Sequence, residues 1–487
     1  MAATGWPAMA SEPVSRRRAL ALLGLGGMVI AAGGVGWTSC AAGKPGSGEA
    51  LTQPQLLTSR DGLLEVTLTA APGTQLAGRE SSAWAYNGTS PGPTLRVKAG
   101  DLLRVKLVNN IDQPTNLHTH GLHVSPQANS DNPFVTVAPG NSFDYTIAVP
   151  ADHPPGTYWY HPHHHGTVAD QIFAGLAGAL LVQDGLDLPV DDDIVLLVTD
   201  TTLDGAGNVI PPSPMVRMAG REGELVLVNG QYQPVITASP GTTHRWRIIN
   251  GCVSRVLDLR LEGHRLTQIA LDGVFLPAPA EHDRLVLAPG NRADLLVRPA
   301  DSGRYALISE PYDRGGLGMM GDMMNGGSAT RGPVTLATLH SQGPAAAAPP
   351  LPATLPAPPV PPDTVTARRQ ITFATGMGMG MGFTIDGRSF DPDRDDQRVQ
   401  LGTTEEWTIV NTSRMDHPFH LHAWPFHVLT PPGTSPAAVR QDVVLVPAGG
   451  SVRLRIPFTD FAGRSVYHCH ILDHEDLGMM ATVNVSA

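Results

Sequence analysis

The chain has 487 residues, which is long enough for two to four domains because single hydrophobic cores stop growing at about 250 to 300 residues. Its 53 glycines, its 44 prolines and a charged fraction of only 16% favour many short strands joined by tight turns over long helices. The formal net charge of −11 argues against nucleic acid as a partner.

The N-terminal stretch, residues 1–49, indicates an export signal followed by a tether. Ser15 and the three arginines after it precede an apolar, glycine-rich run from Ala19 to Gly36, which is typical of a twin-arginine signal. The run is shorter than the roughly 20 strongly apolar residues that a membrane span needs. We therefore expect export to the periplasm, the cell surface or the medium.

Cys40 follows this run and precedes a stretch rich in Gly, Ser and Pro, as at a bacterial lipoprotein attachment site. Two alternatives stay open for it: lipidation, which would tether the protein to a membrane, or loss of the leader by plain cleavage. Of the other two cysteines, Cys252 stands alone in the middle of the chain and Cys469 stands between two histidines, so no disulfide framework is expected.

The rest of the chain contains three copies of one β unit. In each copy a glycine opens an alternating strand that ends nine residues later in Asn, from Gly100 to Asn109, Gly241 to Asn250 and Gly402 to Asn411. Period-two alternation between turn residues is typical of Greek-key β-sandwiches. We predict an all-β protein with sandwich domains at residues 50–188, 189–340 and 363–487 and a Pro/Ala-rich linker at 341–362.

The histidines are clustered. An isolated histidine is most often a surface residue, but ten of the 19 fall in four short motifs. These are His118-Thr-His120, His161-Pro-His163, His417-Pro-Phe-His420-Leu-His422, and His468-Cys469-His470 followed by His474. The first and third copies of the repeat carry them at corresponding positions, whereas the second copy has Leu259, Leu261, Ile308 and Glu310 there.

Two metal sites follow from this arrangement. Alternate residues of a strand point to the same face, so four His-x-His pairs from the first and third domains are expected to converge at their interface. Cys469 and His417 have no metal-binding counterparts in the first domain, so the third domain alone can build a second, mononuclear site. A thiolate, two imidazoles and a weak thioether are the ligands of blue copper, and His417, Cys469, His474 and Met479 supply them.

Zinc is the competing metal for His/Cys sites. Zinc sites close with four ligands at compact spacings, which ten histidines and one cysteine do not match. On a strand, Cys469 faces one way while His468 and His470 face the other. One short covalent path is therefore expected to join the mononuclear site to the cluster.

On these four motifs the chain resembles the multicopper oxidases, the family of laccases, ferroxidases and bacterial cuprous oxidases, over about residues 80 to 487. The resemblance implies three cupredoxin-like domains and four coppers, with substrate oxidation at a type 1 copper and reduction of O2 to water at a three-copper cluster. By motif position it implies type 1 ligands His417, Cys469, His474 and Met479, type 2 ligands His118 and His420, and type 3 ligands His120, His161, His163, His422, His468 and His470. His164 and His165 adjoin His163, but the repeat selects His163.

The resemblance also implies two acidic residues that relay protons to the cluster. Asp131 and Glu475 resemble the family's relays, although Asp131 could instead be a turn residue before Asn132 and Pro133. Thr119 stands where the family usually has an aromatic residue, a change that affects packing and not coordination.

The substrate stays open between Cu(I) and phenols or aromatic amines. Asp442 matches the position at which cuprous oxidases place a carboxylate near the type 1 copper. Thioether tracts suit Cu(I), and two occur, formed by Met319, Met320, Met323 and Met324 and by Met377, Met379 and Met381. Alternatively, these tracts are simply adaptable loops, and an open site with an aspartate also accepts phenols.

Two other classes fit less well. A copper nitrite reductase shares the sandwich and the blue site but lacks the four His-x-His pairs. A division-type or other non-catalytic copper-binding protein would have lost ligands, and none is missing here.

Overall fold

The structure is a computed structural model that describes residues 48–183, 185, 188–316, 332–347, 349–360, 364–375, 382–429 and 439–487. The proposed export signal, Cys40 and both methionine tracts lie outside the described residues. The compact unit Ala42–Ala487 contains everything that follows. No helix within the described part of the chain is long and apolar enough to cross a membrane.

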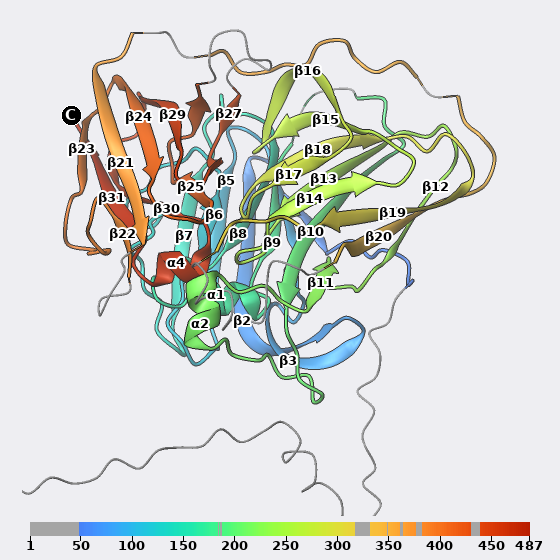
Figure 1. The fold of residues 1–487 in the computed structure, drawn as a ribbon, viewed down its shortest axis with the longest axis horizontal. Coiled ribbons are helices and arrows are strands. Elements are labelled where there is room, and N and C mark those ends of the chain that lie inside the picture. Colours follow the sequence, from blue (N-terminus) through green and yellow to red (C-terminus); the bar gives the residue numbers. More distant parts are fainter. Residues whose placement is uncertain are drawn as a thin grey trace, which may run out of the picture. The chain divides into compact units, whose positions relative to one another are not determined.

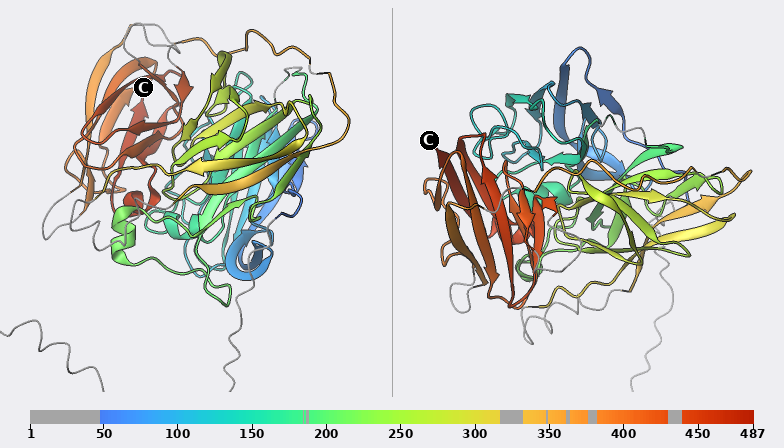
Figure 2. Two further views of the ribbon diagram at one scale, coloured as in Figure 1. Left: turned by 45° about the vertical axis from the view of Figure 1, so that its right-hand side comes forward. Right: turned by 90° about the horizontal axis from the view of Figure 1, so that it is seen from above.

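Six sheets form three β-sandwiches, as predicted, and each sandwich encloses one main core (Figures 1 and 2). The first sandwich pairs a four-stranded with a five-stranded sheet. In sheet order its strands are β3 (Arg79–Tyr86), β2 (Leu63–Leu76), β5 (Leu102–Asn109) and β7 (Ser142–Ala148), against β1 (Leu56–Thr58), β4 (Thr94–Val97), β9 (Gly178–Val182), β8 (Gly156–His161) and β6 (His118–His120).

The second and third sandwiches each pair a six-stranded with a five-stranded sheet. The second contains β11 (Leu225–Val228), β10 (Asp192–Thr201), β13 (His244–Asn250), β18 (Arg292–Val297), β15 (Leu266–Leu271) and β16 (Val274–His282), against β12 (Val235–Ala238), β20 (Val334–Ser341), β19 (Gly303–Glu310), β14 (Leu257–Leu261) and β17 (Leu285–Leu287). The third contains β22 (Phe383–Ile385), β21 (Ala367–Thr375), β24 (Thr403–Asn411), β29 (Ser451–Phe458), β26 (Phe426–Val428) and β27 (Arg440–Gln441), against β23 (Gln397–Gln400), β31 (Met480–Ser486), β30 (Gly463–Cys469), β25 (His417–Leu421) and β28 (Val443–Val446).

The asparagine that ends each repeat strand has the same structural role in all three sandwiches. Asn109, Asn250 and Asn411 are buried, and the side-chain NH2 of each donates to two backbone carbonyls, one four or five residues ahead and one about 30 residues or more ahead, at Val137, Leu287 and Val446 respectively. Each side-chain oxygen accepts from the backbone N–H two residues ahead. The amide thus satisfies backbone groups where the strand leaves its sheet, which explains its recurrence in the sequence.

Three short helices lie together where the sandwiches meet. Figure 1 shows α1 (Val168–Phe173), α2 (Pro214–Ala219) and α4 (Leu472–Asp476) side by side, and α4 contacts both others. Each helix belongs to a different sandwich. Since α4 carries His474, this junction adjoins one of the predicted metal sites.

Candidate metal centres

Strand pairing brings the histidine motifs together in the first and third sandwiches. In the antiparallel pair β6–β8, His118 lies opposite His161, and in the corresponding pair β25–β30, His420 lies opposite His468. The eight histidines of the four His-x-His pairs are at most 2% exposed. Burial is the largest cause that lowers their pKa, which favours the neutral imidazole that binds metals.

In one group of three imidazoles, the Nε2 atoms converge on one point. The Nε2 atoms of His163 and His468 are 3.1 Å apart, and the Nε2 of His422 is 3.2 Å from each. The Nδ1 of His468 donates to the carbonyl of Cys469, so its Nε2 presents a lone pair to the group. Neutral imidazoles whose lone pairs converge in this way fit a metal ion between them.

A second group involves His120, His161 and His470. The Nδ1 of His161 donates to the carbonyl of Pro162, which turns its Nε2 lone pair toward the Nδ1 of His120, 3.4 Å away. The ring of His470 lies 4.9 Å from that of His120, and neither ring nitrogen of His470 has a hydrogen-bond partner among the described residues. Buried nitrogens without a partner are uncommon, and a bound metal would satisfy them.

The third group is a pair, formed by His118 and His420. The Nδ1 of His118 lies 3.0 Å from Asp131, and the Nδ1 of His420 donates to the carbonyl of Asp442. Each ring therefore has its Nε2 free, and within the described part of the chain neither Nε2 has a partner. The eight imidazoles thus present three sets of free nitrogens, which fits a trinuclear centre.

The mononuclear site lies in the third sandwich. The Nδ1 atoms of His417 and His474 are 3.3 Å apart, and the Sγ of Cys469 lies 3.3 Å from the first and 4.0 Å from the second. Burial raises the pKa of the Cys469 thiol, so a thiolate forms there only beside a cation such as a metal. Met479 is fully buried, and its backbone bonds to those of Cys469 and His474, which holds the Met479 backbone next to both residues.

Three neighbours of this site were not found from the sequence. The hydroxyl of Ser413 lies 2.9 Å from the Nε2 of His417, and Phe383 stacks on the ring of His474 with centroids 3.9 Å apart. The Nε2 of His474 donates to the carbonyl of Met218 in α2, so a helix of the second sandwich covers the site. Ser213 and Pro214 are a helix-start signature, but nothing in the sequence indicates what that helix covers.

Salt bridges hold α2 in this position. Arg221, which follows α2, is 2% exposed and bonds to Asp473 through its backbone N–H and its guanidinium, with distances from 2.5 to 3.0 Å. Its Nη1 also lies 2.6 Å from Asp170 of α1, which accepts from Arg217 as well. All three sandwiches therefore contribute charges to the junction beside His474.

The two predicted acidic relays lie beside the histidine cluster. Asp131 contacts His118 and accepts from the backbone N–H of Thr119 at 2.9 Å, and burial raises its pKa to about 7. Glu475 is fully buried, with its oxygens 3.7 Å from the Nε2 of His163 and 3.6 Å from the Nδ1 of His468. Burial also raises the pKa of Glu475.

Asp442 lies elsewhere than expected. Its Oδ1 is 3.0 Å from the Nε2 of His120, and both its oxygens accept from Arg292, at 2.6 and 2.7 Å. It therefore belongs to the surroundings of the histidine cluster, and the prediction that it marks the mononuclear site was wrong. The reason is strand register, because β28 pairs His420 with Val443 and so brings the preceding residue to the cluster.

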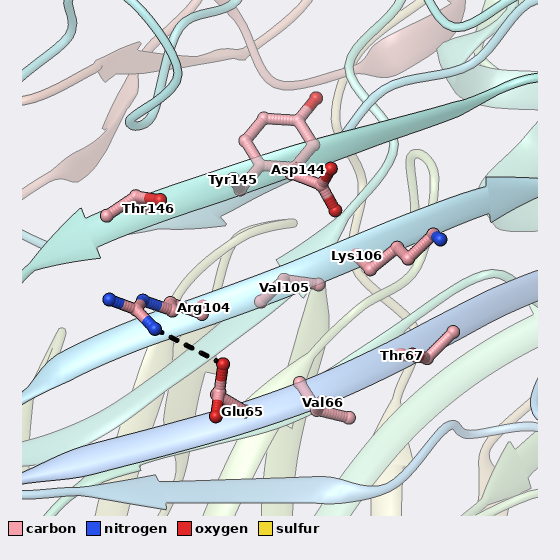
Figure 3. Close-up of a pocket in the computed structure, with 9 residues that line it drawn as sticks. All are labelled: Glu65, Val66, Thr67, Arg104, Val105, Lys106, Asp144, Tyr145 and Thr146. Carbon is pink, nitrogen blue, oxygen red and sulfur yellow. Dashed lines mark hydrogen bonds and ion pairs between the residues drawn. The ribbon is translucent and has the colours of Figure 1, made fainter.

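Other candidate groups lie apart from both centres. His164 and His165 are only partly buried, and the ring of His165 packs against Phe390, whereas His163 points into the cluster. A shallow surface hollow of about 420 Å³ lies on the outer face of β2, β5 and β7 (Figure 3). Its lining includes Glu65 and Arg104 but none of the clustered histidines.

Comparison with known proteins finds similar proteins over most of the described chain. Three family models, each described as multicopper oxidase, match residues 67–187, 193–344 and 356–487. Multicopper oxidase mco of Staphylococcus haemolyticus is 29% identical over 419 residues, covering 83% of this chain and 84% of the relative. Cell division protein FtsP of Edwardsiella tarda is 30% identical over 412 residues, covering 81% and 82%. The solved multicopper oxidase from Campylobacter jejuni, described as a metallo-oxidase, is 30% identical with a TM-score of 0.80, covering 91% of this chain and 96% of that one.

Proposed function

The chain belongs to the multicopper oxidase family and is a laccase-like enzyme, and from this premise we propose that it couples one-electron oxidation of a small reduced substrate to reduction of O2 to water. The observation that carries the proposal is the pair of centres joined by His468, Cys469 and His470. Cys469 belongs to the mononuclear group, and its two neighbours in the chain belong to the histidine cluster.

We assign the ligands by the groups described above. His417, Cys469, His474 and Met479 would hold the type 1 copper, and His118 and His420 the type 2 copper. The type 3 pair would be held by His163, His422 and His468 on one side and by His120, His161 and His470 on the other. When bound, copper would supply single-electron transfer at the mononuclear site and O2 reduction at the cluster, with four ions per chain.

The chain's own residues orient the ligands and handle protons. Backbone carbonyls and Asp131 hold one ring nitrogen of several histidines and leave the other free for metal. Burial raises the pKa of both carboxyl groups, to about 7 for Asp131, which favours a proton on each of them beside the cluster. We propose that they deliver the protons that O2 reduction consumes.

Asp131→Asn and Glu475→Gln test this role. Each change removes a titrating group but keeps a side chain of nearly the same shape, so oxygen uptake should slow by roughly 10²- to 10⁴-fold while the blue colour stays. Retained turnover would remove that residue from the proton pathway.

The substrate is proposed as either Cu(I) or phenols and aromatic amines. Two features of the sequence favoured Cu(I) as the substrate, Asp442 and the methionine tracts. Because Asp442 lies at the histidine cluster, only the methionine tracts still favour Cu(I). Electrons would enter at His474 beneath α2, whose Met215 and Met218 are partly buried. The similar proteins support both substrate classes, since some are named laccases and one is described as a metallo-oxidase.

The deciding experiment is a copper count and visible spectrum of protein expressed with copper, with oxygen uptake on adding Cu(I) or a phenol. An intense thiolate band, four coppers and uptake would support the proposal, and the faster donor would give the substrate class. The likeness to cell division protein FtsP adds a second candidate role for the same fold, in cell division. A colourless protein that takes up no oxygen would refute the proposed oxidase function.

Location and attachment are also proposals. The twin-arginine pattern and Cys40 support an exported enzyme, released or lipid-tethered. Intact-mass analysis of the membrane fraction tests the tether, and finding only an unmodified soluble form would exclude it.

A further inference from the structure

The second sandwich supplies no copper ligand, yet one of its turns reaches the histidine cluster. This turn, residues 288–292, connects β17 to β18. Gly290 sits at its tip with φ +90°, and a Cβ added there would lie 3.1 Å from the Cε1 of His120 and 3.1 Å from two carbons of His470. The tip is therefore in contact with two imidazoles of the same ligand group.

Arg292, the last residue of the turn, is fully buried and holds Asp442 with two parallel hydrogen bonds, at 2.6 and 2.7 Å. Asp442 in turn lies 3.0 Å from the Nε2 of His120. A buried carboxylate that accepts an imidazole N–H keeps the other ring nitrogen free as a ligand. The hydrogen bonds from Arg292 to Asp442 and from Asp442 to His120 thus set which nitrogen of His120 faces the cluster.

The backbone that carries Asp442 is held from the same sandwich. Asp272 accepts from the backbone N–H of Asp442 at 3.3 Å and of Val443 at 3.2 Å, and Asn291 donates to the carbonyl of Val443. The carbonyl of Asp442 itself accepts from the Nδ1 of His420. Both His120 and His420 are therefore oriented by a segment that the second sandwich holds in place.

We propose that the turn 288–292 is a positioning element of the copper cluster, in which Arg292 acts through Asp442 on His120 and Gly290 leaves the space for the rings of His120 and His470. The proposal rests on the proposed function, because it concerns copper binding at the same site. It also gives the metal-free sandwich a role in cluster assembly beyond that of a spacer.

Gly290→Ala tests the space at the tip, and Gly140→Ala is its matched control. Gly140 occupies the corresponding turn of the first repeat with φ +77°, so alanine costs similar backbone strain there, but its Cβ would meet nothing within 4 Å. In Gly290→Ala we expect cluster copper to be lost to a chelator roughly 10- to 100-fold faster, with the blue thiolate band retained. Gly140→Ala should match the wild-type protein.

Arg292→Lys tests the second contact independently of any failure of the glycine variant to fold. Lysine keeps the charge but loses the two parallel bonds to Asp442. Arg245→Lys is the control, because Arg245 is also buried in the second sandwich and pairs at 2.5 Å with Asp294, a residue of the same sandwich. Only Arg292→Lys should lower the ratio of cluster copper to type 1 copper.

The readouts separate this inference from the proposed function. If the wild-type protein binds no copper, the proposed function fails. If it binds its full set and both test variants release copper at the rates of their controls, the positioning role is refuted while the function stands. Equal loss of the blue band and of cluster copper would mean that the turn supports only general folding, which also overturns the proposal.

Discussion

Removing Arg221 should destabilise the protein far more than removing an exposed arginine. Asp473 is fully buried, and Arg221→Met takes away its guanidinium partner, leaving a buried carboxylate that keeps one backbone N–H donor. Breaking a buried pair in this way costs about 3–5 kcal/mol. Asp170 contributes less to the loss, because it retains its bonds to Arg217.

The control is the surface pair of Arg104 and Glu65, which is 3.3 Å apart with side chains 51% and 62% exposed (Figure 3). Arg104→Met should cost about 0–1 kcal/mol, since solvent screens such a pair. Denaturant unfolding of the copper-free proteins measures both effects. A double-mutant cycle with Asp473→Asn isolates the contribution of the buried pair.

The reasoning would be refuted if Arg221→Met cost no more than Arg104→Met. A functional consequence should accompany the loss, because Arg221 holds α2 against α4. The carbonyl of Met218 should then release His474, and the visible band of the type 1 site should shift. An unchanged band with a large loss of stability would show that α2 stays in place without the clamp.

Three further outcomes are expected. Cys469→Ser should abolish the blue band but leave copper in the histidine cluster, which a copper count would detect as a loss of about one ion per chain. Burial lowers the pKa of His161 and His417 to about 3 and that of His468 to about 4, whereas imidazoles of the unfolded chain titrate near 6.5. Between about pH 4 and 6.5 these histidines therefore bind more protons in the unfolded chain than in the folded one. All ten clustered histidines have a lowered pKa, whereas fewer carboxyl groups, among them Asp131 and Glu475, have a raised pKa that acts in the opposite direction. The copper-free protein should therefore lose stability as the pH falls from about 6.5 to about 4, by up to ~1.4 kcal/mol per pH unit for each histidine, and thermal melts across that range would check the sign. Ser413→Ala removes the hydroxyl beside His417 and should shift the type 1 reduction potential without loss of copper, as measured by a redox titration.

The fold and the ligand histidines follow from local patterns. Strand alternation decides which side chains share a face, so spacing alone was enough to place His118 with His120 and His468 with His470 on common faces. The asparagines at the strand ends marked the three repeats because each satisfies backbone groups within its own sandwich. These features depend on residues close in sequence or on neighbouring strands.

Some contacts around the two centres could not be predicted from the sequence because they depend on tertiary structure. These are the contacts of Asp442, Arg292, Gly290 and Met218. Asp442 comes within reach of His120 only because β28 pairs with β25 and because the first and third sandwiches pack together. Arg292 contacts a residue 150 positions away in the sequence, and Gly290 contacts residues at least 170 positions away. No sequence periodicity predicts such contacts. The sequence by itself therefore determined the three sandwiches and the clustering of the histidines around Cys469, because side-chain alternation is local. The packing of separate sandwiches decided which residues orient those ligands, because such contacts exist only once distant parts of the chain have met.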